Sequence, residues 1–99
     1  MYRATTPLQL FNLKTDAASL KKLLITYKQG DNIILRKTKA DVTADGNTVS
    51  FYLTQEETKL FTSDKAVYIQ IRFKDANDRV VASEEITAQV YDVHNDEVL

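Results

Sequence analysis

His94 is the single histidine of the chain and the first residue to consider for chemistry. A catalytic triad needs a histidine held rigidly between a nucleophile and an orienting carboxylate. His94 instead belongs to the polar segment 92–97, close to the end of the sequence, and chain ends are usually mobile. The usual zinc sites need three or four nitrogen or sulfur ligands, and the chain contains no cysteine. We therefore predict a solvated tail there, with no catalytic or metal-binding role for His94.

Acidic residues form the other groupings that could do chemistry. Asp75-Ala76-Asn77-Asp78 is similar to the start of a calcium loop, but Val80 and Ile86 stand where such a loop needs glycine and glutamate. Aspartate and asparagine commonly stabilise turns, so we interpret this segment as a hairpin turn. The pairs Glu56-Glu57 and Glu84-Glu85 lack the apolar surroundings that raise a carboxyl pKa for acid catalysis. The sequence therefore predicts no enzymatic activity.

The small number of glycines and the lack of cysteine exclude several kinds of site. Gly30 and Gly46 stand alone, so no glycine-rich phosphate loop is possible. Without cysteine there is no disulfide framework and no thiolate nucleophile. We expect no cofactor and no bound metal.

Length and composition limit the number of cores and the classes of partner. With 99 residues, the chain has room for one core. Its 13 Lys and Arg residues nearly balance 14 Asp and Glu residues, whereas a nucleic-acid binder normally carries a basic face. No apolar run is long enough to span a membrane, and residues 1–7 lack the apolar segment of a signal peptide. We therefore predict no nucleic-acid partner, no membrane partner and folding in a cytoplasm.

Alternation of apolar and polar residues is the dominant pattern, and it is typical of strands with one buried face. It is clearest in segments 48–53, 66–74 and 86–91, and weaker in segments 6–13, 23–27 and 33–35. The apolar set on the predicted inner faces includes Phe51, Phe73, Ile69, Ile86 and Val90.

Turn residues separate these segments. Gly30 and Gly46 mark two hairpin turns, and we expect short strands at 41–43 and 79–83. Thr54 and Glu57 match a capping box, which predicts a short helical turn that ends near Phe61 and plugs the core. A further turn over residues 16–23 is capped by Thr15 or Asp16. Turn signals at this spacing favour an all-β sandwich or barrel.

Three tyrosines fall on outward positions of the predicted strands: Tyr52, Tyr68 and Tyr91. Exposed tyrosine is common at interfaces, because its ring buries area while its hydroxyl stays hydrogen-bonded. Packing across neighbouring strands would also explain tyrosine at these positions. We take the three residues as the candidate interface.

Several of these segments together carry a resemblance to a known arrangement. They are Leu24-Ile25-Thr26-Tyr27, Ile33-Ile34-Leu35-Arg36-Lys37, Leu53-Thr54-Gln55-Glu56-Glu57-Thr58 and Val67-Tyr68-Ile69-Gln70-Ile71-Arg72-Phe73. Over residues 8–93 the chain resembles small structural proteins from the tail region of phages and prophages of Gram-positive bacteria. It is similar, more distantly, to the Ig-like N-terminal domain of phage baseplate upper proteins.

The resemblance implies an Ig-like antiparallel β-sandwich of about seven strands, with one short helical turn near residues 55–61. We expect a flexible N-terminus over residues 1–5, a single domain over residues 6–93 and a flexible tail over residues 94–99. The implied function is that of a structural module of a virion, made in the host cytoplasm. Its partners would be other phage structural proteins or further copies of itself.

An alternative function is a recognition domain that binds a bacterial-surface glycan or a host protein. In that case an outward tyrosine such as Tyr68 or Tyr52 would stack on a sugar ring.

Overall fold

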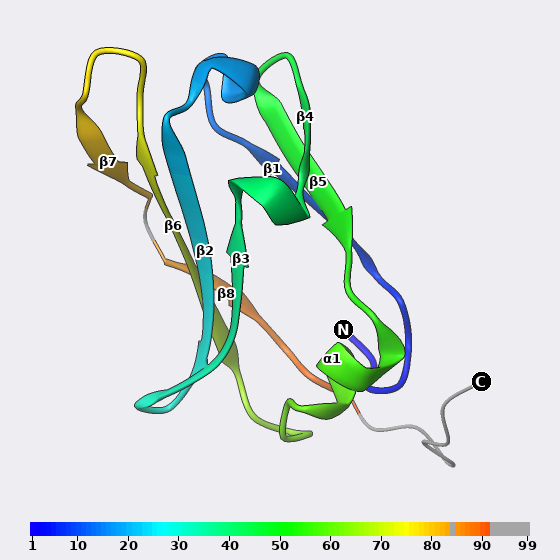
Figure 1. The fold of residues 1–99 in the computed structure, drawn as a ribbon. Helices are drawn as coiled ribbons and strands as arrows, with labels where there is room; N and C mark the ends of the chain where they lie inside the picture. Colours follow the sequence, from blue (N-terminus) through cyan, green and yellow to red (C-terminus); the bar gives the residue numbers. More distant parts are fainter. Residues whose placement is uncertain (84, 92–99) are drawn as a thin grey trace.

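The computed structural model describes residues 1–83 and 85–91, which form two antiparallel sheets and one short α-helix (Figure 1). The strands are β1 (Leu8–Asn12), β2 (Lys22–Gln29), β3 (Asn32–Thr38), β4 (Thr43–Asp45), β5 (Thr48–Tyr52), β6 (Val67–Lys74), β7 (Val80–Ala82) and β8 (Ile86–Ala88). The helix α1 spans Gln55–Lys59, and single 3-10 turns span Ala17–Ser19 and Lys39–Asp41. The fold is therefore mostly β, as predicted.

The two sheets differ in width. The small sheet has three strands in the order β1-β5-β4. The large sheet has five strands, in the order β3-β2-β6, with β7 and β8 both paired to the remaining side of β6. All named strand pairs are antiparallel. The two sheets pack face to face, so the arrangement is sandwich-like.

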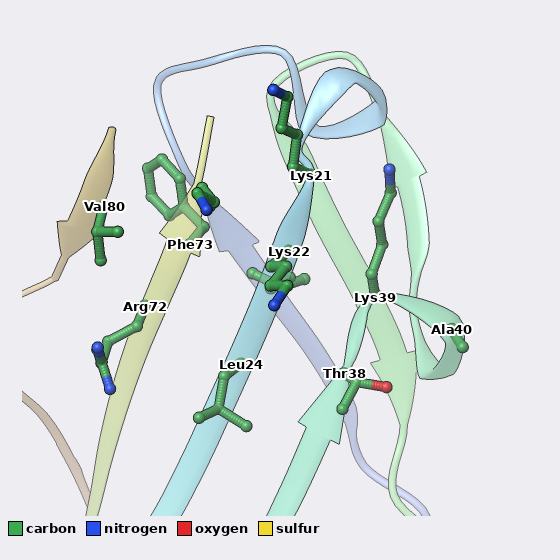
Figure 2. Close-up of a pocket in the computed structure, with 11 residues that line it drawn as sticks. Lys21, Lys22, Leu24, Thr38, Lys39, Ala40, Arg72, Phe73 and Val80 are labelled. Atoms are coloured by element: carbon green, nitrogen blue, oxygen red, sulfur yellow. The ribbon is translucent and has the colours of Figure 1, made fainter. Parts of the chain in front are cut away.

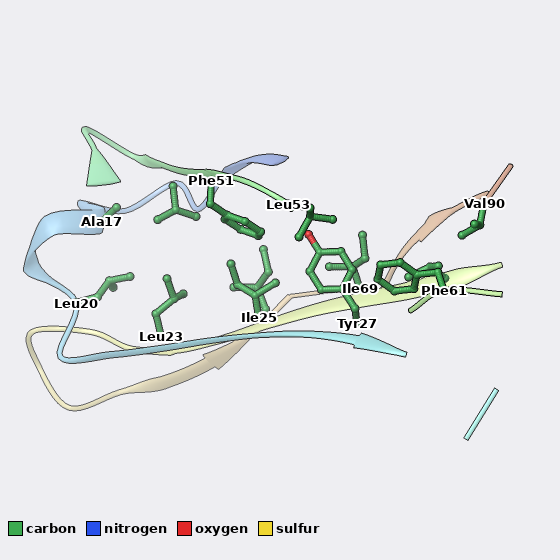
Figure 3. Close-up of a cluster of buried hydrophobic side chains, with 13 residues drawn as sticks. Ala17, Leu20, Leu23, Ile25, Tyr27, Phe51, Leu53, Phe61, Ile69 and Val90 are labelled. Atoms are coloured by element: carbon green, nitrogen blue, oxygen red, sulfur yellow. The ribbon is translucent and has the colours of Figure 1, made fainter. Parts of the chain in front are cut away.

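The core lies between the sheets, where the predicted inner faces meet (Figure 3). Phe51 and Leu53 of the small-sheet side face Ile25 and Tyr27 of β2, and Phe61 closes one end. Burial alternates along β5 and along β6 as far as Arg72, which confirms the period-two pattern. The buried hydrophobic residues are Ala17, Leu20, Leu23, Ile25, Tyr27, Val49, Phe51, Leu53, Phe61, Val67, Ile69, Ile71 and Val90.

Residues that adopt left-handed backbone form the predicted hairpin turns. Gly30 has φ +58° and Gly46 has φ +56°, a conformation that glycine adopts without steric cost. In the turn that contains no glycine, Asp78 takes φ 62°. Asp75 stabilises this turn, because its Oδ1 accepts from the backbone N–H groups of Asn77 and Arg79, both at 2.9 Å. These bonds confirm the turn interpretation of that segment.

The short strand predicted at residues 41–43 is wrong in position. Residues Lys39–Asp41 form a 3-10 turn, and β4 begins only at Thr43. Asp41 is held at the turn because its carboxylate accepts from the Thr38 N–H at 2.8 Å and from the Thr38 hydroxyl at 3.1 Å. The backbone hydrogen bond from Thr38 is the main reason that the pKa of Asp41 is lowered.

The helix α1 begins with the capping box that the sequence predicts. The Thr54 hydroxyl accepts from the Glu57 N–H at 3.1 Å, and the Glu57 carboxylate accepts from the Thr54 N–H at 2.9 Å. Glu57 also forms an ion pair with Lys37, whose ammonium lies 5.9 Å from the centre of the Phe51 ring. Glu57 therefore links the start of the helix to Lys37 of β3, at the edge of the core.

Glu57 makes the stability of the fold depend on pH. Burial raises the pKa of this carboxyl, but the hydrogen bonds from Lys37 and Thr54 outweigh burial and leave the pKa below the usual 4.5. A depressed folded-state pKa stabilises the protein above the unfolded-state value, and this contribution disappears as pH falls through the folded-state pKa. We expect the free energy of unfolding in urea to fall between pH 5 and pH 3 by less in Glu57→Gln than in the unchanged protein. Parallel pH curves for the two proteins would contradict this role.

The first residues of the chain lie against the end of the large sheet. The N-terminal ammonium donates to the Gln89 carbonyl at 2.9 Å, and Arg3 N–H donates to the Tyr91 carbonyl at 2.9 Å. Tyr91 N–H in turn donates to the Met1 carbonyl at 2.7 Å. The flexible N-terminus expected over residues 1–5 stays a prediction, and these bonds weigh against it. The predicted tail at residues 94–99, with His94, lies outside the described residues.

Candidate docking interface

The large sheet extends beyond the small sheet on the side of β7 and β8. Val81 is paired with Phe73, and Ile86 with Ile69, so both side chains point toward the core side of the large sheet. Yet Val81 is 41% exposed and Ile86 is 42% exposed. Ile86 was predicted to be a core residue, and this is wrong: it faces inward, but no strand of the small sheet covers it.

An apolar groove of about 420 Å³ lies between the sheets on this open side. Phe11 and Leu13 line it from the small sheet, and Phe73, Val81 and Ile86 line it from the large sheet. The remaining lining residues are Leu10, Asn12, Lys14, Ile71 and Ser83. The groove is thus an unfilled continuation of the core.

The strand β1 borders this groove and is an edge of the small sheet, because in the described part of the chain it pairs only with β5. Hydrogen bonds from Leu53 N–H to the Pro7 carbonyl (3.1 Å) and from Leu13 N–H to the Asn47 carbonyl (2.8 Å) fix which residues face β5. In an antiparallel ladder the bonded pairs alternate, so the N–H and C=O groups of Leu8, Leu10 and Asn12 point away from β5. The Leu8 carbonyl accepts from the Gln9 side-chain amide at 3.3 Å, and the other groups form an open template for another strand.

Apolar side chains also stand on the outer face beside this edge. Leu8 lies directly opposite Tyr52 across the strand pair, and the two are 51% and 67% exposed. Leu10, on the same face of β1, is 63% exposed. The strand therefore carries apolar side chains on both faces, which is the pattern of a strand that is buried on both sides.

A buried tyrosine holds β1 in place from inside. The Tyr27 hydroxyl donates to Gln9 Oε1 at 2.7 Å, which links the large sheet to β1 through the core. Burial, with a smaller effect of the Glu57 charge, raises the pKa of Tyr27 well above its usual value, so the hydroxyl stays protonated and donates. The edge strand is thus a fixed element with a defined register.

Removing this hydroxyl should loosen β1 by a modest amount. We expect Tyr27→Phe to lower the free energy of unfolding by about 1 kcal/mol, the usual net value of one such hydrogen bond. Urea unfolding measures the loss, and the exchange rate of the Gln9 amide should rise with it. An unchanged Gln9 exchange rate would show that the bond does not hold the strand.

The three tyrosines of the candidate interface do not form one surface. Tyr52 stands on the outer face of the small sheet, whereas Tyr68 stands on the outer face of the large sheet, on the opposite side of the sandwich. Tyr91 is paired with Tyr2, with ring centres 5.2 Å apart. Of the three, Tyr52 lies nearest to the free edge in the strand order, because β5 adjoins β1.

Leu8, Leu10 and the exposure of Val81 and Ile86 were not predicted from the sequence. The two-sided apolar pattern of segment 6–13 could have indicated the first two residues, because a strand with one solvated face should alternate. The exposure of Val81 and Ile86 had no local signal, since it depends on how far one sheet extends beyond the other.

The described residues contain neither a membrane-spanning helix nor a metal-binding cluster. None of their helices has the length and apolar character needed to cross a bilayer. No group of three or more His, Cys, Asp or Glu side chains among them is arranged to hold a metal ion.

Comparisons with known proteins leave the family open. The scan against protein-family models found no match, and the searches of curated proteins and of solved structures found no significant match.

Proposed function

We propose that this protein is a non-enzymatic docking module that accepts an extended strand of another protein at the free edge of β1. The observation that carries the proposal is the pair of inward-facing residues Val81 and Ile86, which remain about two-fifths exposed beside the edge of β1, where no strand of the described residues pairs. The small sheet has three strands against five and leaves this side of the large sheet uncovered. An incoming strand would cover it.

An added strand fits the dimensions of this side. Neighbouring strands lie about 4.8 Å apart and packed sheets about 10 Å apart, so a strand paired to β1 would run over the groove. Its inward side chains would pack on Val81 and Ile86, and its outward side chains on Leu8 and Leu10. Such strand addition combines main-chain hydrogen bonds for affinity with side-chain pockets for specificity.

The partner is proposed from the resemblance of residues 8–93 to phage tail-region proteins. On that basis the sandwich is Ig-like, the strand donor is another structural protein of the particle, and the module is located in the virion. The structure supports the docking step through the edge and the groove, and the resemblance alone supports the phage origin.

The test presents the purified proteins encoded beside this gene, one at a time, to the purified chain. We expect saturable binding of one of them, with new amide protection at Leu8, Leu10 and Asn12 measured by NMR. Co-purification of the chain with phage particles would support the virion assignment separately. Binding that leaves these amides unprotected would place the interface elsewhere, and binding to no neighbour would overturn the partner assignment.

A further inference from the structure

The outer face of the large sheet, opposite the docking interface, is strongly basic. Register places Lys22 beside Lys74, Arg72 beside Leu24, and Lys28 beside Tyr68. The neighbouring strand β3 adds Arg36, which lies beside Thr26 of β2. The near-zero net charge of the chain therefore hides a segregation of charge, with these cations gathered on one face.

Most of these cations have no acidic partner. Among the described residues, the side chains of Lys22, Lys28, Arg36 and Arg72 make no ion pair and no hydrogen bond. Lys74 lies opposite Lys22, and its nearest carboxylate is that of Asp78 at 4.0 Å. Like charges directly opposite in a sheet destabilise it, so folding does not explain this arrangement.

Two shallow grooves run across the face. The first, of about 580 Å³, is lined by Lys22, Arg72 and Lys74 around Leu24, and Figure 2 shows Lys22 and Leu24 on β2 beside Arg72 on β6. The second, of about 380 Å³, is lined by Lys28, Arg36, Arg72 and Tyr68. Arg72 lines both grooves, so together they form one track along the sheet.

We propose that this face binds an acidic polysaccharide. The cations would pair with its carboxylates or other anionic groups, and the Tyr68 ring, 39% exposed, would pack on a sugar ring. Arg36 and Arg72 lie on either side of β2, on strands about 10 Å apart, and the register offsets them by two residues, so they would contact different acidic groups of one chain. This function is independent of strand docking at β1.

The neutral side chains of the track favour a glycan over a nucleic acid. Thr26 and Gln70 lie between the arginines and offer hydroxyl and amide groups suited to sugar hydroxyls. Single-stranded nucleic acids are usually held by several aromatic rings on which successive bases stack, whereas Tyr68 is the aromatic residue that lines this second groove. Glu85 also lines it and would repel either kind of polyanion, so the preference for a glycan rests on the neutral groups and on the aromatic content of the groove.

The experiment titrates the purified chain with oligogalacturonate, with neutral dextran oligomers and with oligo-dT, at two salt concentrations. We expect saturable, salt-sensitive binding of oligogalacturonate and no binding of dextran. The double variant Arg36→Gln/Arg72→Gln should weaken binding about 100-fold, since each arginine would supply a charge-assisted hydrogen bond that contributes about tenfold to affinity. Glu85→Gln should strengthen it.

Matched controls separate this site from general attraction. Lys14→Gln/Lys59→Gln removes the same charge away from the face and should leave affinity within about twofold, because exposed charges far from a ligand are screened by salt. Tyr68→Ala should weaken binding and Tyr52→Ala, on the opposite face, should not. The proposal is overturned if oligogalacturonate does not bind, if oligo-dT binds more tightly, or if the control pair weakens binding as much as the arginine pair. Because Leu10 is not on this face, Leu10→Pro should bind oligogalacturonate normally whether or not strand docking exists.

Discussion

Leu10→Pro should weaken strand docking about 100-fold and leave the isolated protein folded. The N–H of Leu10 points away from β5, so proline removes no hydrogen bond of the small sheet, and proline is tolerated at strand edges of this kind. In a complex, the substitution removes one main-chain donor and the apolar contacts of Leu10. The combined loss is about 3 kcal/mol, or about 100-fold in affinity.

A neighbouring substitution provides the matched control. Phe11 N–H faces β5, so Phe11→Pro should break the ladder and unfold or strongly destabilise the chain. Circular dichroism and urea unfolding distinguish the two variants before any binding is measured. Leu10→Lys, which places a charge on the edge without altering the backbone, is the second variant if Leu10→Pro fails to fold. Unchanged partner binding in a folded Leu10 variant would contradict docking at β1.

Gln29→Leu should lower the free energy of unfolding several times more than the same change at an exposed glutamine. Gln29 is 2% exposed, and its amide nitrogen donates to the carbonyls of Thr62 at 2.9 Å and Lys65 at 3.2 Å. Its amide oxygen accepts from Thr62 N–H at 2.8 Å. Leucine has a similar size but leaves these backbone groups of the loop without a partner. The three bonds are partly buried and each contributes about 1 kcal/mol, so we expect a loss of about 3 kcal/mol in the free energy of unfolding.

The exposed residue Gln70 is the comparison for this change. Gln70→Leu, on the outer face of the large sheet, should alter the free energy of unfolding by about 0.5 kcal/mol or less. Urea unfolding of the two variants gives the difference directly. Equal stabilities would show that the loop after α1 does not depend on Gln29.

Local patterns predicted the elements of this fold well. Alternation identified β5 and β6 because each strand buries one face, and Gly30 and Gly46 marked turns that need left-handed backbone. The capping box was predictable because Thr54 and Glu57 bond to each other within one turn. In each case the physical cause lies within a few residues of the chain.

The candidate site was less predictable, because its causes are not local. Whether Ile86 is covered depends on the width of the small sheet, which no single segment encodes. The basic face is assembled from β2, β3 and β6, so each strand alone shows only ordinary outward cations. Gln29 adjoins the turn marked by Gly30, where polar residues are expected to be exposed, and its burial arises only from the distant loop that it binds.

Amide hydrogen exchange along β1 tests the central claim most directly. In the free protein, the amides of Leu8, Leu10 and Asn12 should exchange quickly, whereas those of Gln9, Phe11 and Leu13 should be protected by their bonds to β5. When a protein partner binds, the first three should become protected as well, because they then donate to the added strand. If the alternation is absent in the free protein, or if a bound partner leaves those three amides exchanging quickly, β1 is not the docking edge.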